Sequence, residues 1–239
     1  MTGAPLVQAV AANLAAVRAR IAAAAARAGR APEGVRLVAV SKTFGPEHVR
    51  AAAAAGQRDF GENRVQEALP KMAACADLSL DWHLIGHLQS NKARKSVGPF
   101  TCLQSIDSLA LLRRLDAVAV ELARDVRVLL QVDLAGEATK FGAPPEEARA
   151  MLDEAPRLAR VRVGGLMLLP PLFEDPEQVR PYFQRLRAFR DEQLARGVPP
   201  VHLAELSMGM SHDFEVAVEE GATMVRVGTA VFGTRGVPR

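Results

Sequence analysis

Short apolar runs alternate with longer segments of mixed apolar and charged residues along most of this chain. The short runs are almost continuously hydrophobic, which is typical of strands that are covered on both faces. The longer segments often open with proline or a polar residue and close with glycine, as helices do. The pattern predicts eight strands, at 35–42, 58–61, 81–86, 100–106, 126–134, 161–169, 201–207 and 223–233. Seven of them precede a predicted helix, at 45–56, 62–74, 88–96, 107–125, 144–155, 175–197 and 211–221.

This alternation of strand and helix predicts a parallel sheet, because each helix carries the chain back to the start of the next strand. Eight such units within 239 residues favour a closed (β/α)₈ TIM barrel over an open sheet. An alanine-rich segment at the N-terminus predicts one extra helix before the first strand. No linker-like stretch interrupts the chain, so residues 1–239 are expected to form a single α/β domain. In such barrels the chemistry lies at the carboxyl ends of the strands.

Charge and composition argue against several classes of protein. The 30 Lys and Arg residues exceed the 27 Asp and Glu residues by only three, which gives a net charge of +3. The densest basic stretch, 91–96, fits a solvated helix face. We therefore expect no nucleic-acid partner. The spacing of Cys75 and Cys102 matches no metal site or redox motif. Two unpaired thiols are consistent with a reducing compartment. Arg18 and Arg20 interrupt the N-terminal segment, so no signal peptide is expected. No apolar run is expected to be long enough to span a bilayer. These features predict a soluble, monomeric, cytoplasmic protein.

Lys42 stands at the end of the first predicted strand, in the segment VAVSKT. A lysine at a strand end usually lies in solvent at the edge of a loop. In a barrel, the same position lies at the end where active sites form. A desolvated amine held there can form a Schiff base with an aldehyde or ketone. Lys42 is therefore the first candidate for chemistry.

The last two predicted strands lead into residues that suit an anion. Arg226 lies inside the apolar eighth strand, where its charge needs a partner, and Gly228 and Thr229 follow it. The loops after strands seven and eight of TIM barrels commonly bind phosphate through backbone N–H groups. Ser211 stands at the start of the seventh predicted helix, where we expect it to be an N-cap whose hydroxyl could also meet an anion. The alternative is that Ser211 only caps its helix and Gly228 only turns the chain.

Together these candidates indicate a ligand with three functional groups. A phosphate would lie at the loops after strands seven and eight, an aldehyde would meet Lys42, and an acceptor atom between them would meet Arg226. Pyridoxal 5′-phosphate (PLP) has all three, with its ring nitrogen as the acceptor. Because arginine can only donate, that nitrogen would stay unprotonated and the ring would be a weak electron sink. A phosphate-handling barrel enzyme that binds a different carbonyl compound is an alternative.

Four longer motifs add a family resemblance. The segments VAVSKT, FGENRVQEA, WHLIGHLQSNK and LSMGMSHDFEVAVEEGATMVRVGTAVFG closely resemble the pyridoxal phosphate homeostasis protein family, and the resemblance covers nearly the whole chain. It implies a fold-type III barrel related to the N-terminal domain of alanine racemase. It also implies a covalent aldimine between PLP and Lys42, with Arg226 facing the ring nitrogen. Ser211, Gly228 and Thr229 would hold the phosphate.

Several further polar residues lie near the predicted strand ends. Asn63 and His83 are expected to face PLP; the alternative makes Asn63 a helix cap paired with Gln66, and His83 an interior imidazole with satisfied hydrogen bonds. Lys140, after the fifth strand, is a second amine near the same end. Asp133 stands where the resemblance leads us to expect asparagine.

The residues support holding PLP better than using it. Racemisation needs an acid–base group on each face of the amino acid, normally a lysine and a tyrosine, and the related racemase takes its tyrosine from a second domain. We expect no such domain here, and the single tyrosine, Tyr182, is predicted in an outer helix. The expected function is intracellular PLP homeostasis without catalytic residues or a metal ion, with apo PLP-dependent enzymes as candidate partners. A weak or specialised PLP-dependent amino-acid racemase that uses Lys42 is the alternative.

Overall fold

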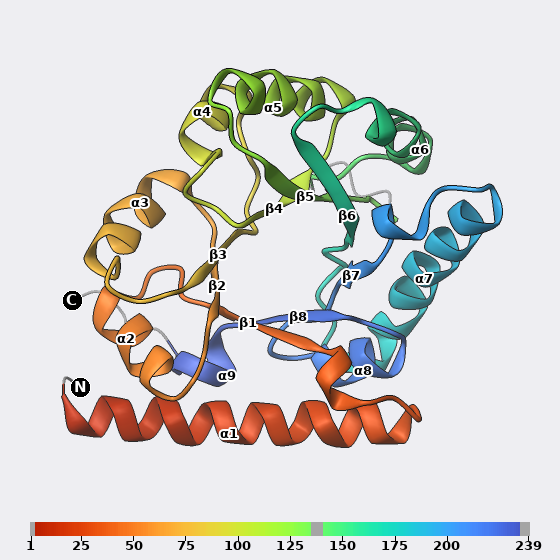
Figure 1. Cartoon of the computed structure of the whole chain (residues 1–239). Helices are drawn as coiled ribbons and strands as arrows, with labels where there is room; N and C mark the ends of the chain where they lie inside the picture. Colours follow the sequence, from red (N-terminus) through yellow and green to blue (C-terminus); the bar gives the residue numbers. More distant parts are fainter. Residues whose placement is uncertain (1–2, 135–140, 235–239) are drawn as a thin grey trace.

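The computed structural model describes residues 3–134 and 141–234, and it shows a closed barrel of parallel strands inside a ring of helices (Figure 1). Each strand pairs with the next one along the chain, and the last pairs with the first. The strands are β1 (Arg36–Val40), β2 (Asp59–Glu62), β3 (Asp81–Leu84), β4 (Cys102–Ile106), β5 (Val126–Gln131), β6 (Val161–Met167), β7 (Glu205–Ser207) and β8 (Met224–Val227). The predicted TIM barrel is confirmed.

The helices follow the predicted order around the barrel. They are α1 (Ala4–Arg27), α2 (Pro46–Ala54), α3 (Val65–Ala74), α4 (Ala93–Ser96), α5 (Leu109–Glu121), α6 (Pro145–Glu154), α7 (Arg180–Ala195), α8 (Phe214–Glu219) and α9 (Thr229–Phe232). Short 3₁₀ turns lie at Pro32–Gly34, Ser90–Lys92, Ala155–Arg157, Pro176–Val179 and Pro200–His202. The helix predicted at 88–96 is therefore wrong in extent, because a 3₁₀ turn takes up its first half.

The last two strands are shorter than the apolar runs that predicted them. In the run 201–207, residues Pro200–His202 form a 3₁₀ turn, and only Glu205–Ser207 pair as β7. A proline has no N–H to give to a sheet, and two prolines precede this run. The run 223–233 leaves the sheet before Gly228, and α9 follows instead of further strand. The exit of β8 is thus a helix start.

Helix α1 lies along the outside of the barrel, across the side formed by α2, β1, β8 and α8 (Figure 1). Its buried residues recur at helical spacing and contact α2, α8 and α9; they are Leu6, Val10, Leu14, Val17, Ile21, Ala24 and Ala25. By length and composition alone α1 could cross a membrane, contrary to the expectation that no apolar run is long enough. The packed stripe explains its hydrophobic residues.

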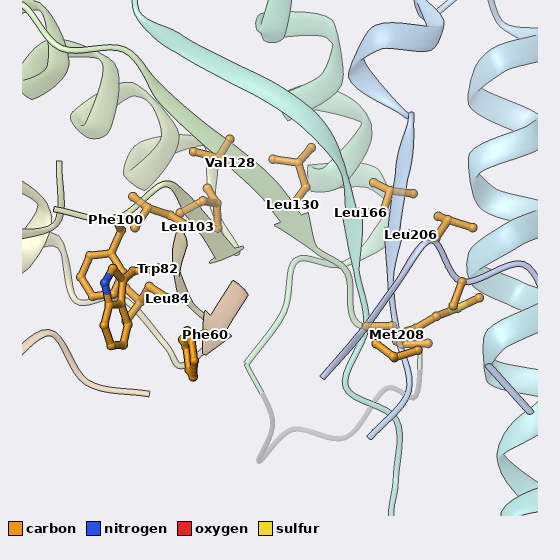
Figure 2. Close-up of a cluster of buried hydrophobic side chains, with 14 of the residues drawn as sticks. Phe60, Trp82, Leu84, Phe100, Leu103, Val128, Leu130, Leu166, Leu206 and Met208 are labelled. Carbon is orange, nitrogen blue, oxygen red and sulfur yellow. The ribbon is translucent and has the colours of Figure 1, made fainter. Parts of the chain in front are cut away.

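The hydrophobic core lies between the strands and the surrounding helices. Figure 2 shows part of this layer, with Phe60, Trp82, Leu84, Phe100, Leu103, Val128, Leu130, Leu166, Leu206 and Met208 labelled. Successive side chains of a strand point to opposite faces. Residues that alternate with this set, such as His83, Gln104 and Ser207, therefore lie on the inner face of the barrel. The two faces carry different chemistry.

Candidate functional site

Lys42 lies two residues beyond the end of β1, at the carboxyl end of the barrel, and is partly buried. Its neighbour Thr43 has a φ of 70°, a left-handed conformation that residues other than glycine rarely adopt. The Phe44 N–H donates to the Ser41 carbonyl at 3.1 Å, which closes a tight turn around Lys42. Strained backbone of this kind clusters at functional sites, where the surroundings enforce it. The exit of β1 is therefore a structured turn that carries the candidate amine.

A buried ion pair between β2 and α3 supports this turn. Lys71 donates to the Ser41 carbonyl at 2.7 Å and to Glu62 Oε1, and the Ser41 hydroxyl donates to the same oxygen at 2.6 Å. The Glu62 side chain is fully buried and that of Lys71 is 8% exposed. The sequence analysis missed this pair. The sequence does contain a sign of the pair, because Lys71 occupies a position on the otherwise apolar face of α3.

Ser211 joins the loops that follow β7 and β8. Its hydroxyl oxygen accepts from the N–H of Gly228 at 3.1 Å and from that of Ala230 at 3.4 Å, at the start of α9. The predicted N-cap role of Ser211 is wrong, because α8 has Asp213 at its N-cap. The hydroxyl instead serves the neighbouring loop, where Thr229 begins the helix. An acceptor oxygen thus already lies at the amides of the expected phosphate site.

Gly228 brings this loop against the exit of β1. A side chain at Gly228 would lie 3.3 Å from the carbonyl oxygen of Val40, closer than most side chains approach a neighbour. Phe232 of α9 packs against Phe44, with ring centroids 5.2 Å apart. The structure therefore brings together the loop that carries Lys42 and the loop that starts α9.

Arg226 lies on the inner face of β8 and is 2% exposed. Its Nη1 donates to the Ser207 hydroxyl at 2.6 Å, and its Nη2 donates to the Leu168 carbonyl at 2.8 Å. Burial lowers the pKa of Arg226 to about 10, and the charge of Asp213 opposes this shift. The guanidinium is still a cation at neutral pH and can only donate. It is a fixed donor between the ends of β6 and β7.

Asn63 directly follows β2, at the same end of the barrel as Lys42. Its backbone packs so tightly on Gly86 that any side chain at Gly86 would collide with the Asn63 carbonyl. The predicted capping pair with Gln66 is wrong, because α3 has Arg64 at its N-cap and no side-chain cap. The expected contact between Asn63 and a ligand stays a prediction.

His83 lies inside the barrel and is 1% exposed. Its Nε2 is 3.1 Å from Asp59 Oδ1, and its Nδ1 is 2.9 Å from Gln104 Nε2. Both ring nitrogens therefore have protein partners, which matches the alternative of an interior imidazole. A direct contact of His83 with PLP stays a prediction, but its hydrogen bonds lead through Gln104 toward Arg226.

Other residues from the sequence analysis lie apart from this group or outside the described segments. Tyr182 lies in α7, in the outer ring of helices, and packs against Phe173 with ring centroids 5.9 Å apart. Asp133 follows β5, and its N–H donates to the Ala143 carbonyl at 2.8 Å. Lys140 lies outside the described residues. Within those residues, no group of three or more His, Cys, Asp or Glu side chains could hold a metal ion.

Comparison with known proteins identifies close relatives over almost the whole chain. Residues 12–236 match the family model of the alanine racemase N-terminal domain. A pyridoxal phosphate homeostasis protein of Aquifex aeolicus is 46% identical over 216 residues, which cover 90% of this chain and 94% of that one. The protein of the same name from Escherichia coli K12 is 40% identical, covering 95% of this chain and 97% of the other. The family resemblance drawn from the motifs is confirmed.

Solved structures agree with the fold. PipY of Synechococcus elongatus, with PLP bound, has a TM-score of 0.82 at 44% identity, covering 94% of this chain and all of that one. Alanine racemase of Clostridium difficile has a TM-score of 0.74 at 15% identity, covering 96% of this chain but 58% of the racemase. The second likeness shows the barrel fold alone.

Proposed function

We propose, from the premise that this chain belongs to the pyridoxal phosphate homeostasis protein family, that it binds PLP and serves the intracellular homeostasis of this cofactor. The observation that carries the proposal is the meeting of three groups at one end of the barrel. These are the turn that carries Lys42, the buried guanidinium of Arg226 and the loop around Gly228. PipY, a relative with the same fold, has been solved with PLP bound.

The residues at this end of the barrel fit each part of PLP. The Ser211 hydroxyl already occupies an acceptor position beside the amides of Gly228 and Ala230, so oxygen atoms of a phosphate suit the same donors. We assign phosphate binding to Ser211, Gly228 and Thr229. Arg226 is a buried donor with a fixed orientation, which suits a neutral ring nitrogen.

Lys42 is the amine that we assign to the aldehyde. When bound, PLP supplies an aldehyde carbon that condenses with a primary amine and releases one water molecule. The Ser41 carbonyl and the Glu62–Lys71 pair hold the turn that carries Lys42 at the carboxyl end of the barrel. Asn63 follows the neighbouring strand and is assigned to the wall of the same site.

We further propose that the protein holds PLP without robust catalysis. A ring nitrogen that Arg226 keeps unprotonated stabilises a carbanion weakly, and the hydroxyl of Tyr182 belongs to the outer helix α7. Lys42 can move a proton on one face of a bound amino acid, but we find no second base on the opposite face among the described residues. A monomer that passes PLP to apo enzymes in the cytoplasm fits this role. Both cysteines are free thiols in the structure, which is consistent with a reducing compartment.

Spectroscopy of the purified protein with PLP tests the assignment of Lys42. We expect an absorbance band of a lysine-bound cofactor, and borohydride should fix the cofactor to the peptide that contains Lys42, as read by mass spectrometry. The variant Lys42→Ala should lose most of this absorbance, whereas Lys95→Ala, at an exposed lysine, should keep it. Full absorbance in Lys42→Ala would contradict the assignment and make Lys140 the next candidate. No band in the wild type would favour the alternative of an enzyme for a different carbonyl compound.

The racemase alternative is tested by inversion of configuration. Amino acids should shift the spectrum of the loaded protein without useful racemisation, because a missing acid–base group costs about 10²–10⁴-fold. A panel of single-enantiomer amino acids measures formation of the opposite enantiomer by chiral chromatography. Racemisation at about 1–10³ per second, the usual range for enzymes, would support the racemase alternative.

A further inference from the structure

We propose that Ser207, Gln104, His83 and Asp59 are positioning residues that fix the Arg226 guanidinium through a one-directional hydrogen-bond chain across the inside of the barrel. The inference rests on the proposed function, which assigns Arg226 to the ring nitrogen of PLP. It adds that the orientation of this donor is set from the opposite end of the barrel.

The chain connects five strands through consecutive short contacts. Arg226 Nη1 on β8 lies 2.6 Å from Ser207 Oγ on β7, and Ser207 Oγ lies 2.7 Å from Gln104 Oε1 on β4. Gln104 Nε2 lies 2.9 Å from His83 Nδ1 on β3, and His83 Nε2 lies 3.1 Å from Asp59 Oδ1 on β2. The four members other than Asp59 are at most 2% exposed. Water therefore has little access to the bonds that join Arg226, Ser207, Gln104 and His83.

The direction of the chain follows from the chemistry of its ends. Arg226 can only donate, so the Ser207 oxygen accepts there and its own hydrogen goes to Gln104 Oε1. The amide nitrogen of Gln104 also lies 2.9 Å from the sulfur of Met224. A thioether has no hydrogen to give, so the atom that faces it must be the NH₂ group.

This orientation of Gln104 decides the tautomer of His83. The Gln104 NH₂ group donates to Nδ1, so Nδ1 carries no hydrogen, and the ring hydrogen lies on Nε2 and points to the Asp59 carboxylate. If the oxygen and nitrogen of the Gln104 amide were exchanged, the Ser207 oxygen would face two donors and the Ser207 hydroxyl hydrogen would lose its acceptor. The Gln104 carbonyl oxygen would then face the Met224 sulfur. Buried polar groups left without partners are costly, so the chain has one stable direction.

The far end of the chain is anchored by charge. Asp59 is the first residue of β2, at the amino end of the barrel, and it lines a cavity of about 310 Å³ together with Asp81, Arg36, Arg127 and Glu205. Arg36 Nε lies 3.8 Å from Asp59 Oδ1, which supports the ionised carboxylate. The hydrogen-bond chain thus runs from the guanidinium of Arg226 to the carboxylate of Asp59, and each group in between accepts from the previous one and donates to the next.

The tautomer can be measured without any cofactor. Histidine-ring ¹⁵N NMR of the wild-type protein should show the hydrogen of His83 on Nε2 at neutral pH. Gln104→Met and Asp59→Ala should each shift the tautomer populations, because each removes one partner of the ring. Gln193→Met is the matched control, because it replaces a fully buried glutamine on α7. A hydrogen on Nδ1 in the wild type would overturn the proposal.

The orientation of Arg226 has its own readout in the same samples. The Nη hydrogens should exchange slowly with water in the wild type, and Ser207→Ala or Gln104→Met should speed this exchange at least about tenfold, the equivalent of one lost hydrogen bond. Ser207→Thr keeps the hydroxyl and should restore slow exchange, and Gln193→Met should not alter it. Unchanged exchange in folded Ser207→Ala would overturn the proposal.

The link to PLP is tested by titration. The affinity for PLP should fall about tenfold in Ser207→Ala and Gln104→Met and stay near wild type in Gln193→Met. Wild-type affinity in both chain variants would overturn the link to PLP, whereas PLP binding by the wild type would still support the proposed function. Conversely, a wild type that binds no PLP would overturn the proposed function, and the NMR measurements would still decide whether the chain exists.

Discussion

The two faces of the barrel wall are built on opposite principles. The outer face, toward the helices, is filled by side chains such as Phe60, Leu103 and Leu206, whose contacts depend on area and volume. The inner face has a small apolar cluster of Cys102, Leu129 and Met167, and beside it carries Gln104 and Arg226, whose contacts depend on which group donates and which accepts. The difference predicts that changes on the outer face cost stability, while changes on the inner face alter the site.

One polar group breaks this division. Glu62 shares its face of β2 with Phe60, so it belongs to the outer layer, yet its side chain is fully buried and paired with Lys71 of α3. Glu62 Oε2 has no hydrogen-bond partner in the described structure. The pair lies next to Ser41, which precedes the candidate amine at Lys42. The exception therefore occurs where the outer layer meets the site.

The largest expected effect is that of breaking this pair. Lys71→Met leaves the Glu62 carboxylate buried without its cation, and we expect the free energy of unfolding to fall by about 3–5 kcal/mol. Urea unfolding followed by circular dichroism measures this loss. The double variant Glu62→Leu, Lys71→Met removes both charges and should recover a substantial part of it. A double variant as unstable as the sum of the single variants would show that the polar contacts to Ser41, rather than the pair, hold the turn.

A cavity in the outer layer should cost stability and spare the site. Leu130→Ala on β5 replaces a fully buried side chain, and we expect a loss of about 2–5 kcal/mol in the free energy of unfolding. The affinity of the folded protein for PLP should stay near wild type. Leu172→Ala, at a side chain that is 78% exposed, is the control and should change little. A large loss of PLP affinity in Leu130→Ala would mean that the two faces are coupled.

The outer face is also the part that the sequence predicts well. Continuous apolar strands and helices with apolar stripes follow from residue type and spacing, so the eight strands and their order could be read directly. Lys42 and Arg226 are candidates from the sequence because a charged residue within or after an apolar strand is conspicuous. The predicted boundaries are less accurate at β7, which starts only after the turn Pro200–His202, and at β8, which ends before Gly228.

The inner face could be predicted only in part, for a physical reason. Hydrogen bonds between Gln104, Ser207 and His83 join strands that are far apart in sequence, and no local pattern records their pairing. Ser211 has the residue type and position of an N-cap, but its hydroxyl accepts from the loop of Gly228 instead. Local propensity was overruled by a tertiary contact.

A smaller effect is expected at the loops that join β7 and β8 to their helices. Ser211→Ala removes an acceptor from the Gly228 loop in the free protein. In the complex that we propose, it also removes a donor to phosphate. We expect PLP binding to weaken by about 1.5–3 kcal/mol, as for one charge-assisted hydrogen bond. Pyridoxal, which lacks the phosphate, should bind more weakly than PLP and be less affected by the variant. Equal affinities for pyridoxal and PLP would show that these loops do not bind the phosphate.

The smallest expected effect is a pH dependence at the edge of the inner face, where Asp213 approaches Arg226. Burial raises the pKa of Asp213 above its ordinary value of 3.8, although the Met210 N–H and the charge of Arg226 act against this shift. A carboxyl group whose folded pKa is raised adds stability that is fully present below the unfolded value and is lost as pH rises through the folded value. Asp213→Asn lacks this loss, and its Oδ1 can still accept from Met210. The stability of the variant relative to wild type should therefore increase from about pH 4 to pH 7, measured by urea unfolding across that range. If the relative stability instead falls with pH, the attraction between Asp213 and Arg226 outweighs burial. The Asp213 carboxylate would then hold the guanidinium in addition to Ser207.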